Sequence, residues 1–273
     1  MKSFTVNGKT MRYQDIGTGE VLLFGHSYLW HSQMWQPQIA ALSQNYRCIV
    51  PDLWSHGQSD AAPDDMHSLK DYAGHMLALM DHLAIESFSI IGLSVGGMWG
   101  TELALIAPER VNALVLMDTF IGLEPEVMHA KYFAMLDTAI ATQSFPEPMV
   151  PQVLAMFFSA GALQQTPEPD FVTAFRTFLL EISGPQVAEM GRIGKIVFDR
   201  RDLMDEVDAL NLPVLIMVGE RDQPRPVLES HLMLDAIAGS RLVVIPQAGH
   251  ISNLEQPEFV TQALQDFFEP LAR

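Results

Sequence analysis

A serine between two glycines is the residue in this chain best placed to do chemistry. Residues 92–96 read G-L-S-V-G, with an apolar run before them and a helical pattern after them. A serine at a sharp strand-to-helix turn presents its hydroxyl above the sheet, and the flanking glycines leave room for the neighbouring strand and helix. The first amides of the helix point at the same spot, where they stabilise an oxyanion. The pattern predicts Ser94 as a nucleophile and the Val95 amide as an oxyanion donor.

A serine hydroxyl is a weak nucleophile until a base takes its proton, so a histidine must lie within reach. In the strand–serine–helix arrangement the chain order is serine, acid, histidine. Three histidines follow Ser94, and His129 falls in a long helical insertion while His231 falls within a helix. His250 instead follows the last apolar strand, in a loop at the sheet edge that also carries the serine. We therefore predict His250 as the general base.

The histidine needs a carboxylate to fix its tautomer and orientation. Asp222 lies just beyond the apolar run 214–218, in a turn that can bring its carboxylate to the far ring nitrogen. Glu220 in the same loop and Asp118 after the preceding strand remain alternatives, because either could cap a loop or serve as the partner. We predict Asp222 as the acid of a Ser-His-Asp triad.

Strands and helices alternate along the chain, which is typical of parallel βαβ units. Asn7-Gly8 between the runs 4–6 and 10–15 predicts an opening hairpin, because both residues tolerate positive φ. Short apolar runs and helical spacing then predict further elements. The strands are expected over 21–24, 46–50, 88–93, 111–117, 214–218 and 242–245, and the helices over 31–44, 69–83, 98–107, 227–237 and 257–268.

This alternation stops at about Thr119, and 80 to 90 residues rich in Met, Phe, Pro and Glu intervene before it resumes. Such a length is far more than an ordinary connection needs. We expect an inserted helical cap over 121–208, and an α/β core domain formed by 1–120 and 209–273.

The charge balance excludes some partners. The 33 acidic and 16 basic residues give a formal net charge of −17, which repels nucleic acids and anionic membranes. The one cysteine, Cys48, lies in a predicted buried strand, as expected of an inert thiol in a reducing compartment. The N-terminus has no signal-like apolar core, and no run of about 18 uncharged apolar residues follows. A cytoplasmic protein is expected.

Three further segments resemble a known family. Residues 23–28, L-F-G-H-S-Y, lie where that family has an apolar strand ending in His-Gly-x; His26 matches the histidine, Ser27 stands where the family usually has glycine, and Tyr28 takes the x position. His56-Gly57-Gln58-Ser59 resembles its G-x-G-x-S loop with Ser55 for the first glycine, which we interpret as a structural turn. Residues 249–257 resemble its catalytic histidine segment. Outside the cap, the chain resembles α/β-hydrolases of the carboxylesterase and 3-oxoadipate enol-lactonase-like group.

The resemblance implies a fold and a mechanism. The fold is α/β, with a mostly parallel eight-stranded sheet flanked by helices and an inserted helical cap. Ser94 attacks an ester carbonyl, the amides of Val95 and Tyr28 hold the oxyanion, and water activated by His250 cleaves the acyl-enzyme. No cofactor and no metal are implied, and the partner is a small ester or lactone bound by a monomer or homodimer.

Apolar residues near these segments predict the substrate pocket. They are Leu29, Trp30, Trp99, Met135, Phe157 and Ile251. A carboxylesterase for small acyl esters is the first expectation, and an enol-lactonase or C–C bond hydrolase, whose substrates carry carboxylates, is the second. The second requires a dedicated cation. The cap offers Lys131, Arg176, Arg192, Lys195, Arg200 and Arg201. A hydrolase-fold signal receptor that keeps its triad is a third reading, because fold does not fix function.

Overall fold

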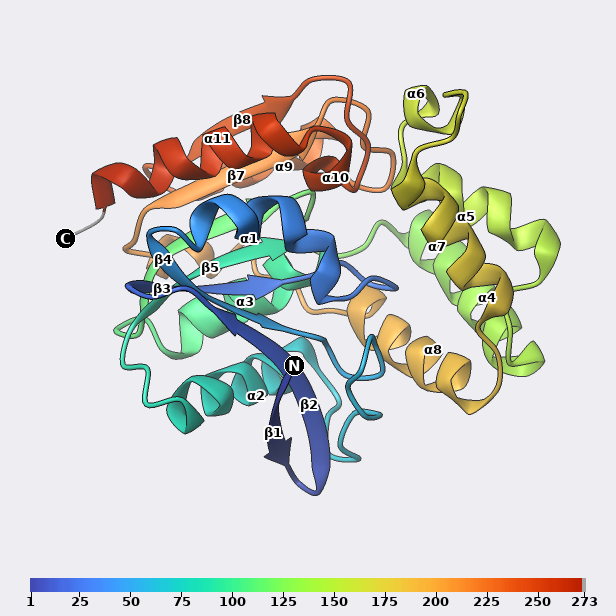
Figure 1. Ribbon diagram of the computed structural model, residues 1–273, viewed down its shortest axis with the longest axis horizontal. Helices are drawn as coiled ribbons and strands as arrows, with labels where there is room; N and C mark the ends of the chain where they lie inside the picture. Colours follow the sequence, from blue (N-terminus) through green and yellow to red (C-terminus); the bar gives the residue numbers. More distant parts are fainter. Residues whose placement is uncertain (272–273) are drawn as a thin grey trace.

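The sheet orders the whole molecule. A computed structural model describes residues 1–271, and its eight strands form one sheet in the order β1-β2-β4-β3-β5-β6-β7-β8 (Figure 1). Their bounds are β1 Lys2–Val6, β2 Lys9–Ile16, β3 Glu20–Gly25, β4 Tyr46–Pro51, β5 Phe88–Leu93, β6 Val111–Met117, β7 Val214–Gly219 and β8 Arg241–Ile245. Strand β2 pairs antiparallel with β1 and β4, and every other pairing is parallel. The predicted mostly parallel eight-stranded sheet is confirmed.

The opening hairpin forms where the Asn-Gly pair predicts it. Val6 pairs with Lys9, and the two turn residues have φ values of 48° at Asn7 and 78° at Gly8. Both lie in the left-handed region that a two-residue hairpin turn requires. The strand β2 is therefore the one reversed strand in an otherwise parallel sheet.

Helices cover both faces of the sheet. The helices of the sheet region are α1 Gln36–Leu42, α2 Leu69–His82, α3 Val95–Ile106, α9 Val227–Ala236, α10 Ser252–Glu255 and α11 Pro257–Phe268. Helices α1 and α11 pack together on one side, and α2 and α3 pack together on the other (Figure 1). The helix predicted over 31–44 is divided, because Ser32–Trp35 forms a 3₁₀ turn and α1 begins just before Pro37, which suits a first helical turn.

An inserted helical region separates β6 from β7. It contains α4 Glu126–Thr142, α5 Val150–Phe157, α6 Ala160–Leu163, α7 Asp170–Glu181 and α8 Pro185–Phe198. These helices gather at one end of the sheet, with α4 packed against α8 and α5 against α7 (Figure 1). The predicted helical insertion is confirmed, and the exact division at 121–208 stays a prediction. Within residues 1–271, every helix is too short or too polar to cross a membrane.

The chain reverses its direction of winding between β3 and β5. From β3 it passes to β4 on one side, and β5 then adds on the other side of β3. In open α/β sheets, ligands bind beyond the carboxyl ends of the strands at such a point. The loop after β3 and the turn after β5 both lie here, so the sheet brings residues 26–30 beside Ser94.

Candidate active site

Ser94 occupies a strained turn between β5 and α3. Its φ of 55° and ψ of −117° are unfavourable for a residue with a side chain, and such strain persists only when the surroundings hold it. The Ser94 amide donates to the Met117 carbonyl at 2.8 Å, and the Ser94 carbonyl accepts from the Thr119 hydroxyl at 2.7 Å. Bonds to the end of β6 therefore fix the turn from both sides.

The two flanking glycines are required by close backbone contacts. A Cβ on Gly92 would lie 2.3 Å from the carbonyl carbon of Gly96, and a Cβ on Gly96 would lie 2.3 Å from the carbonyl oxygen of Gly25. These distances are far inside van der Waals contact. The G-x-S-x-G pattern thus brings the start of α3 directly against the end of β3, where the loop 26–30 begins.

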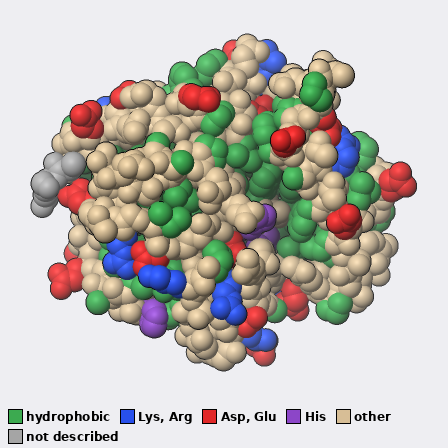
Figure 2. All heavy atoms as spheres, viewed as in Figure 1, with side chains coloured by type: hydrophobic (Ala, Val, Ile, Leu, Met, Phe, Trp, Pro, Cys, Tyr) green, Lys and Arg blue, Asp and Glu red, His purple; other side chains and the backbone are tan. Residues whose placement is uncertain are grey.

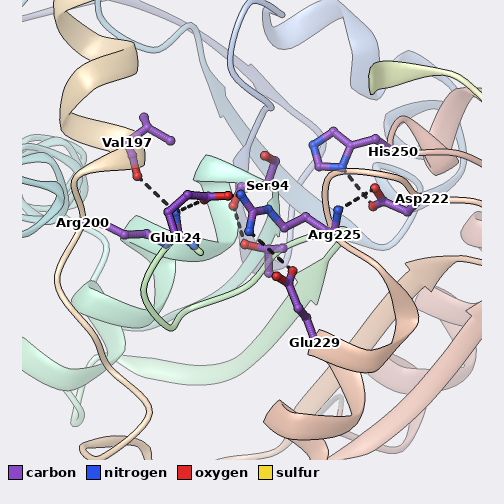
Figure 3. Close-up of polar contacts among 9 residues, drawn as sticks. Ser94, Glu124, Val197, Arg200, Asp222, Arg225, Glu229 and His250 are labelled. Carbon is purple, nitrogen blue, oxygen red and sulfur yellow. Dashed lines mark hydrogen bonds and ion pairs between the residues drawn. The ribbon is translucent and has the colours of Figure 1, made fainter. Parts of the chain in front are cut away.

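His250 and Asp222 form a buried pair beside this turn. The Nδ1 atom of His250 lies 2.9 Å from Oδ2 of Asp222, and Oδ1 of Asp222 accepts from the Arg225 amide at 3.0 Å (Figure 3). Both side chains are buried. A carboxylate at this distance accepts a hydrogen bond from a protonated Nδ1, which leaves the lone pair of Nε2 free.

The rival acids and histidines lie elsewhere. Burial, with the nearby charge of Asp222, raises the pKa of Asp118 well above its usual value, and its oxygens lie 2.7 Å from the Gly219 amide and 2.5 Å from the Ser252 hydroxyl. Glu220 is exposed and accepts from the Gln247 amide. His129 and His231 are not buried. Of the three candidate acids, Asp222 is the one that contacts the His250 ring.

Ser94 and His250 line one small cavity of about 30 Å³, which we call the Ser94–His250 cavity. A second, apolar cavity of about 50 Å³ lies under the inserted helices. Both are lined by Tyr28, Tyr132, Met156, Phe157 and Phe198. Since a water molecule needs roughly 10 to 15 Å³, these spaces are too small for an ester, and a substrate enters only if cap residues move.

The predicted pocket residues divide into two groups. Leu29, Met135 and Phe157 line the apolar cavity. Trp30, Trp99 and Ile251 line neither cavity: Trp30 stacks on Phe175 at 4.8 Å between ring centroids, Trp99 packs against Gly25, and Ile251 is fully buried. The ring of Trp99 turns toward the sheet because Gly25 has no side chain to exclude it.

Two neutral histidines hold the loop that carries the predicted oxyanion donor Tyr28. Nδ1 of His26 donates to the Ser27 carbonyl at 2.7 Å while its Nε2 accepts from the Leu53 amide at 2.8 Å. His56 makes the equivalent pair, with Nδ1 at 2.7 Å from the Trp54 carbonyl and Nε2 accepting from the Leu29 amide at 3.0 Å. Each ring donates once and accepts once, so each must be neutral. The 26–30 loop is thus cross-linked to residues 53–56.

These histidines predict a loss of stability in acid. Burial lowers the pKa of His56 from 6.5 to about 4, and that of His26 well below 6.5. Between pH 6.5 and pH 4, His56 binds a proton in the unfolded chain but stays neutral in the folded protein. The free energy of unfolding therefore falls as the pH drops through this range. At His56 the gap is worth about 3 kcal/mol. Urea denaturation at several pH values should show a smaller decrease for His56→Gln than for the unaltered protein; equal decreases would contradict this assignment.

The cap is joined to the His250 loop by main-chain contacts. The Ile251 amide donates to the Phe157 carbonyl at 3.1 Å, and Oε1 of Glu255 accepts from the amides of Ser159 at 3.0 Å and Gly249 at 3.1 Å. A Cβ on Gly249 would lie 2.5 Å from the Ser159 nitrogen. The end of α5 therefore rests directly on the backbone that holds the histidine.

A buried group of charges borders the same cavity. Arg225 lines the Ser94–His250 cavity, and its side chain extends from beside Asp222 to Glu124, with Glu229 at 3.4 Å (Figure 3). Arg200 donates to the same Glu124 oxygen at 2.8 Å, and its Nε and Nη2 atoms have no partner within residues 1–271. Burial and the charge of Arg225 lower the pKa of Arg200 to about 10. Arg225 was missed because only cap cations were considered; its place three residues after Asp222, between two prolines, was the available signal.

Most of the predicted cap cations are engaged or exposed. Arg176 pairs with Glu168, Lys195 with Asp137, and Arg201 with Glu102 and Glu206. Arg192 donates to main-chain carbonyls at positions 62 and 66, and Lys131 is exposed. Figure 2 shows acidic side chains spread around the rim of one face and hydrophobic ones gathered near the cap. Among these cap cations, Arg200 is the one that shares Glu124 with Arg225, which lines the Ser94–His250 cavity.

Comparisons with known proteins agree with this fold. A family model described as the alpha/beta hydrolase fold matches residues 20–257. The chain is similar to 3-oxoadipate enol-lactonase 2 of Acinetobacter baylyi, at 26% identity over 96% of this chain and 94% of that one, and to carboxylesterase YbfK of Bacillus subtilis, at 28% over 90% and 79%. A thermophilic esterase from Thermogutta terrifontis, in a malate-bound structure, superposes with a TM-score of 0.88 at 26% identity, over 99% of this chain and 97% of that one. The chain belongs to the α/β-hydrolase fold family.

Proposed function

We propose that this protein is a serine hydrolase that cleaves carboxylic esters of small acyl substrates through an acyl-enzyme. One observation carries the proposal: Ser94 and His250 line the same cavity, and Nδ1 of His250 lies 2.9 Å from Oδ2 of Asp222. Nucleophile, base and orienting acid are the three parts that acyl transfer from a serine requires. The similarity to esterases and an enol-lactonase supports the same class.

Each residue has one role in the proposed reaction. The Ser94 hydroxyl attacks the carbonyl carbon and passes its proton to Nε2 of His250, which then protonates the leaving alcohol. Asp222 stabilises the imidazolium and keeps the ring in place. Water, deprotonated by His250, attacks the acyl-enzyme; the Ser94–acyl bond breaks, the acid is released, and His250 returns the proton to the Ser94 oxygen. We assign the oxyanion to the amides of Val95 and Tyr28, and such a preorganised donor is worth about 3 to 4 kcal/mol in the transition state.

The apolar surroundings favour a small neutral acyl or alcohol group. The apolar cavity continues from the site under residues 121–208, which we assign as a cap over the core formed by 1–120 and 209–273. Its lining residues include Leu29, Met135 and Phe157. Such a lining gains free energy by burying hydrocarbon and gives no charge for an ionised substrate to meet.

Arg225 favours a second candidate, the hydrolysis of an ester or lactone that carries a carboxylate. Its side chain lines the Ser94–His250 cavity, and Arg200 behind it keeps the Nε–Nη2 edge of its guanidinium without a partner in residues 1–271. A guanidinium can bind a carboxylate in two-point contact, and Arg225 is the one that borders the cavity. Glu124 and Glu229 already offset much of the positive charge, so the neutral ester remains the first proposal.

A substrate series tests both candidates. We expect many turnovers per enzyme on short-chain p-nitrophenyl esters, and lower kcat/KM on matched half-esters of dicarboxylic acids and on carboxylate-bearing lactones. The reverse preference, lost in Arg225→Met, would establish the second candidate. A single slow turnover followed by ligand-dependent binding of another protein would instead indicate a receptor and would refute both.

A further inference from the structure

Ser27 has a buried hydroxyl that no contact explains. The side chain is fully buried, and its Oγ has no hydrogen-bond partner within residues 1–271. The Ser27 carbonyl, in contrast, accepts from Nδ1 of His26 at 2.7 Å and from the Trp30 amide at 3.1 Å. A buried hydroxyl without a hydrogen-bond partner is destabilising, so we expect Ser27 to gain a hydrogen-bond acceptor when the protein acts on its substrate.

The position of Ser27 indicates which partner this is. Ser27 lines the Ser94–His250 cavity and immediately precedes Tyr28, whose amide we assign to the oxyanion. The sequence has serine here where the resembling family usually has glycine. When Ser94 attacks a carbonyl in this cavity, the carbonyl oxygen takes the electron pair of its π bond and becomes a strong acceptor that did not exist before.

We propose that the Ser27 hydroxyl is a third donor to the oxyanion, beside the amides of Val95 and Tyr28. This inference rests on the proposed function. Ser27 transfers no proton in this contact, because the Ser94 proton goes to His250. Ser27 only donates a hydrogen bond, which returns to its ground-state length when the carbonyl re-forms. His26 and His56 hold the backbone on both sides, so the donor is preorganised and does not have to be ordered during the reaction.

The contact is expected to act on the transition state alone. The neutral carbonyl of the bound ester is a weaker acceptor than the oxyanion, so removing the hydroxyl lowers kcat and leaves KM nearly unchanged. The loss of one such donor in a serine hydrolase lowers kcat by about 100-fold or more. With two amides remaining, we expect Ser27→Ala to lower kcat by about 100-fold.

Ser55 provides a matched control. It is also buried with an unpartnered Oγ, and it lies in the neighbouring 53–56 segment, but it lines neither cavity. Both alanine variants lose an unpaired hydroxyl, so both should keep or slightly raise the melting temperature. Of these two alanine variants, only Ser27→Ala should have a lower kcat. A third variant, Ser27→Gly, should show the same decrease in kcat whatever its stability.

The experiment measures kcat, KM and melting temperature for the unaltered enzyme, Ser27→Ala, Ser27→Gly and Ser55→Ala with p-nitrophenyl acetate. Inhibition by phenylboronic acid, which forms a tetrahedral adduct on serine, should weaken by a similar factor in both Ser27 variants. Activity within threefold of the unaltered enzyme, or losses that follow melting temperature and recur in Ser55→Ala, would overturn the inference alone. An unaltered protein that turns over no ester or lactone would overturn the proposed function and this inference with it.

Discussion

Ser94→Ala is expected to lower kcat on p-nitrophenyl acetate by about 10⁶-fold, because without the hydroxyl no acyl-enzyme forms. Residual activity over the uncatalysed rate should survive, since the oxyanion donors and the binding site remain. Alanine adopts the same backbone at φ 55° with no more strain than serine, so the fold should be kept. Stopped-flow kinetics should show a burst of p-nitrophenol equal to the enzyme concentration in the unaltered protein and none in the variant.

A control variant separates this loss of kcat from a loss of folded enzyme. Ser230 is also buried, but it lies in α9 and does not line the cavity. Ser230→Ala should keep the unaltered kcat. If Ser94→Ala retained a tenth or more of the activity, another residue would be the nucleophile.

Asp222→Asn is expected to lower kcat by about 10⁴-fold. Asparagine keeps the shape but offers an NH₂ group or a weaker acceptor to Nδ1 of His250, which leaves the ring in the wrong tautomer for taking the Ser94 proton. The pair is buried at 2.9 Å, so water cannot replace the lost charge. Initial rates from pH 5 to 10 should show a loss throughout this range, with partial recovery at high pH as hydroxide replaces the missing base.

Asp118→Asn is the matched control for this prediction. Asparagine keeps the shape of Asp118, and its amide oxygen can still accept from the Gly219 amide. Burial raises the pKa of Asp118 and so disfavours its charged form, which asparagine does not carry. We expect activity within a few-fold of the unaltered enzyme. Nearly intact hydrolysis in Asp222→Asn combined with a large loss in Asp118→Asn would make Asp118 the acid.

The sequence predicted best the features that local chemistry determines. Asn7-Gly8 made the hairpin because few residue pairs accept two positive φ values, and Gly92 and Gly96 marked the turn at Ser94 because their neighbours exclude a Cβ. The alternation of strands and helices predicted a parallel α/β sheet, and the long break in it predicted the helical insertion. The family resemblance implied the eight strands, and all three predictions are confirmed. His250 was placed beside Ser94 by chain order and strand position.

The pocket was predicted less well because it depends on side-chain directions. Trp99 lies near the start of α3, close in sequence to Ser94, but its ring fills the space that Gly25 leaves in the core. Trp30 stacks on Phe175 across the junction with the cap, a contact between residues 145 positions apart that no local pattern encodes. Arg225 was not predicted because the search for cations covered only the cap; its place close behind Asp222 was a sequence signal, whereas its buried ion pair with Glu124 depends on the fold.

The contacts between the end of α5 and the His250 loop also limit how caps can be exchanged within the family. Phe157 and Ser159 contribute backbone atoms to these contacts, which reach the Ile251 amide and the Glu255 carboxylate. The Ser159 backbone lies so close to Gly249 that a Cβ there would not fit. A chimera that receives the helices of a relative must therefore reproduce this short backbone segment, whatever its side chains. A graft that omits it would leave the histidine loop without part of its support, so the acquired specificity would come with a slower enzyme.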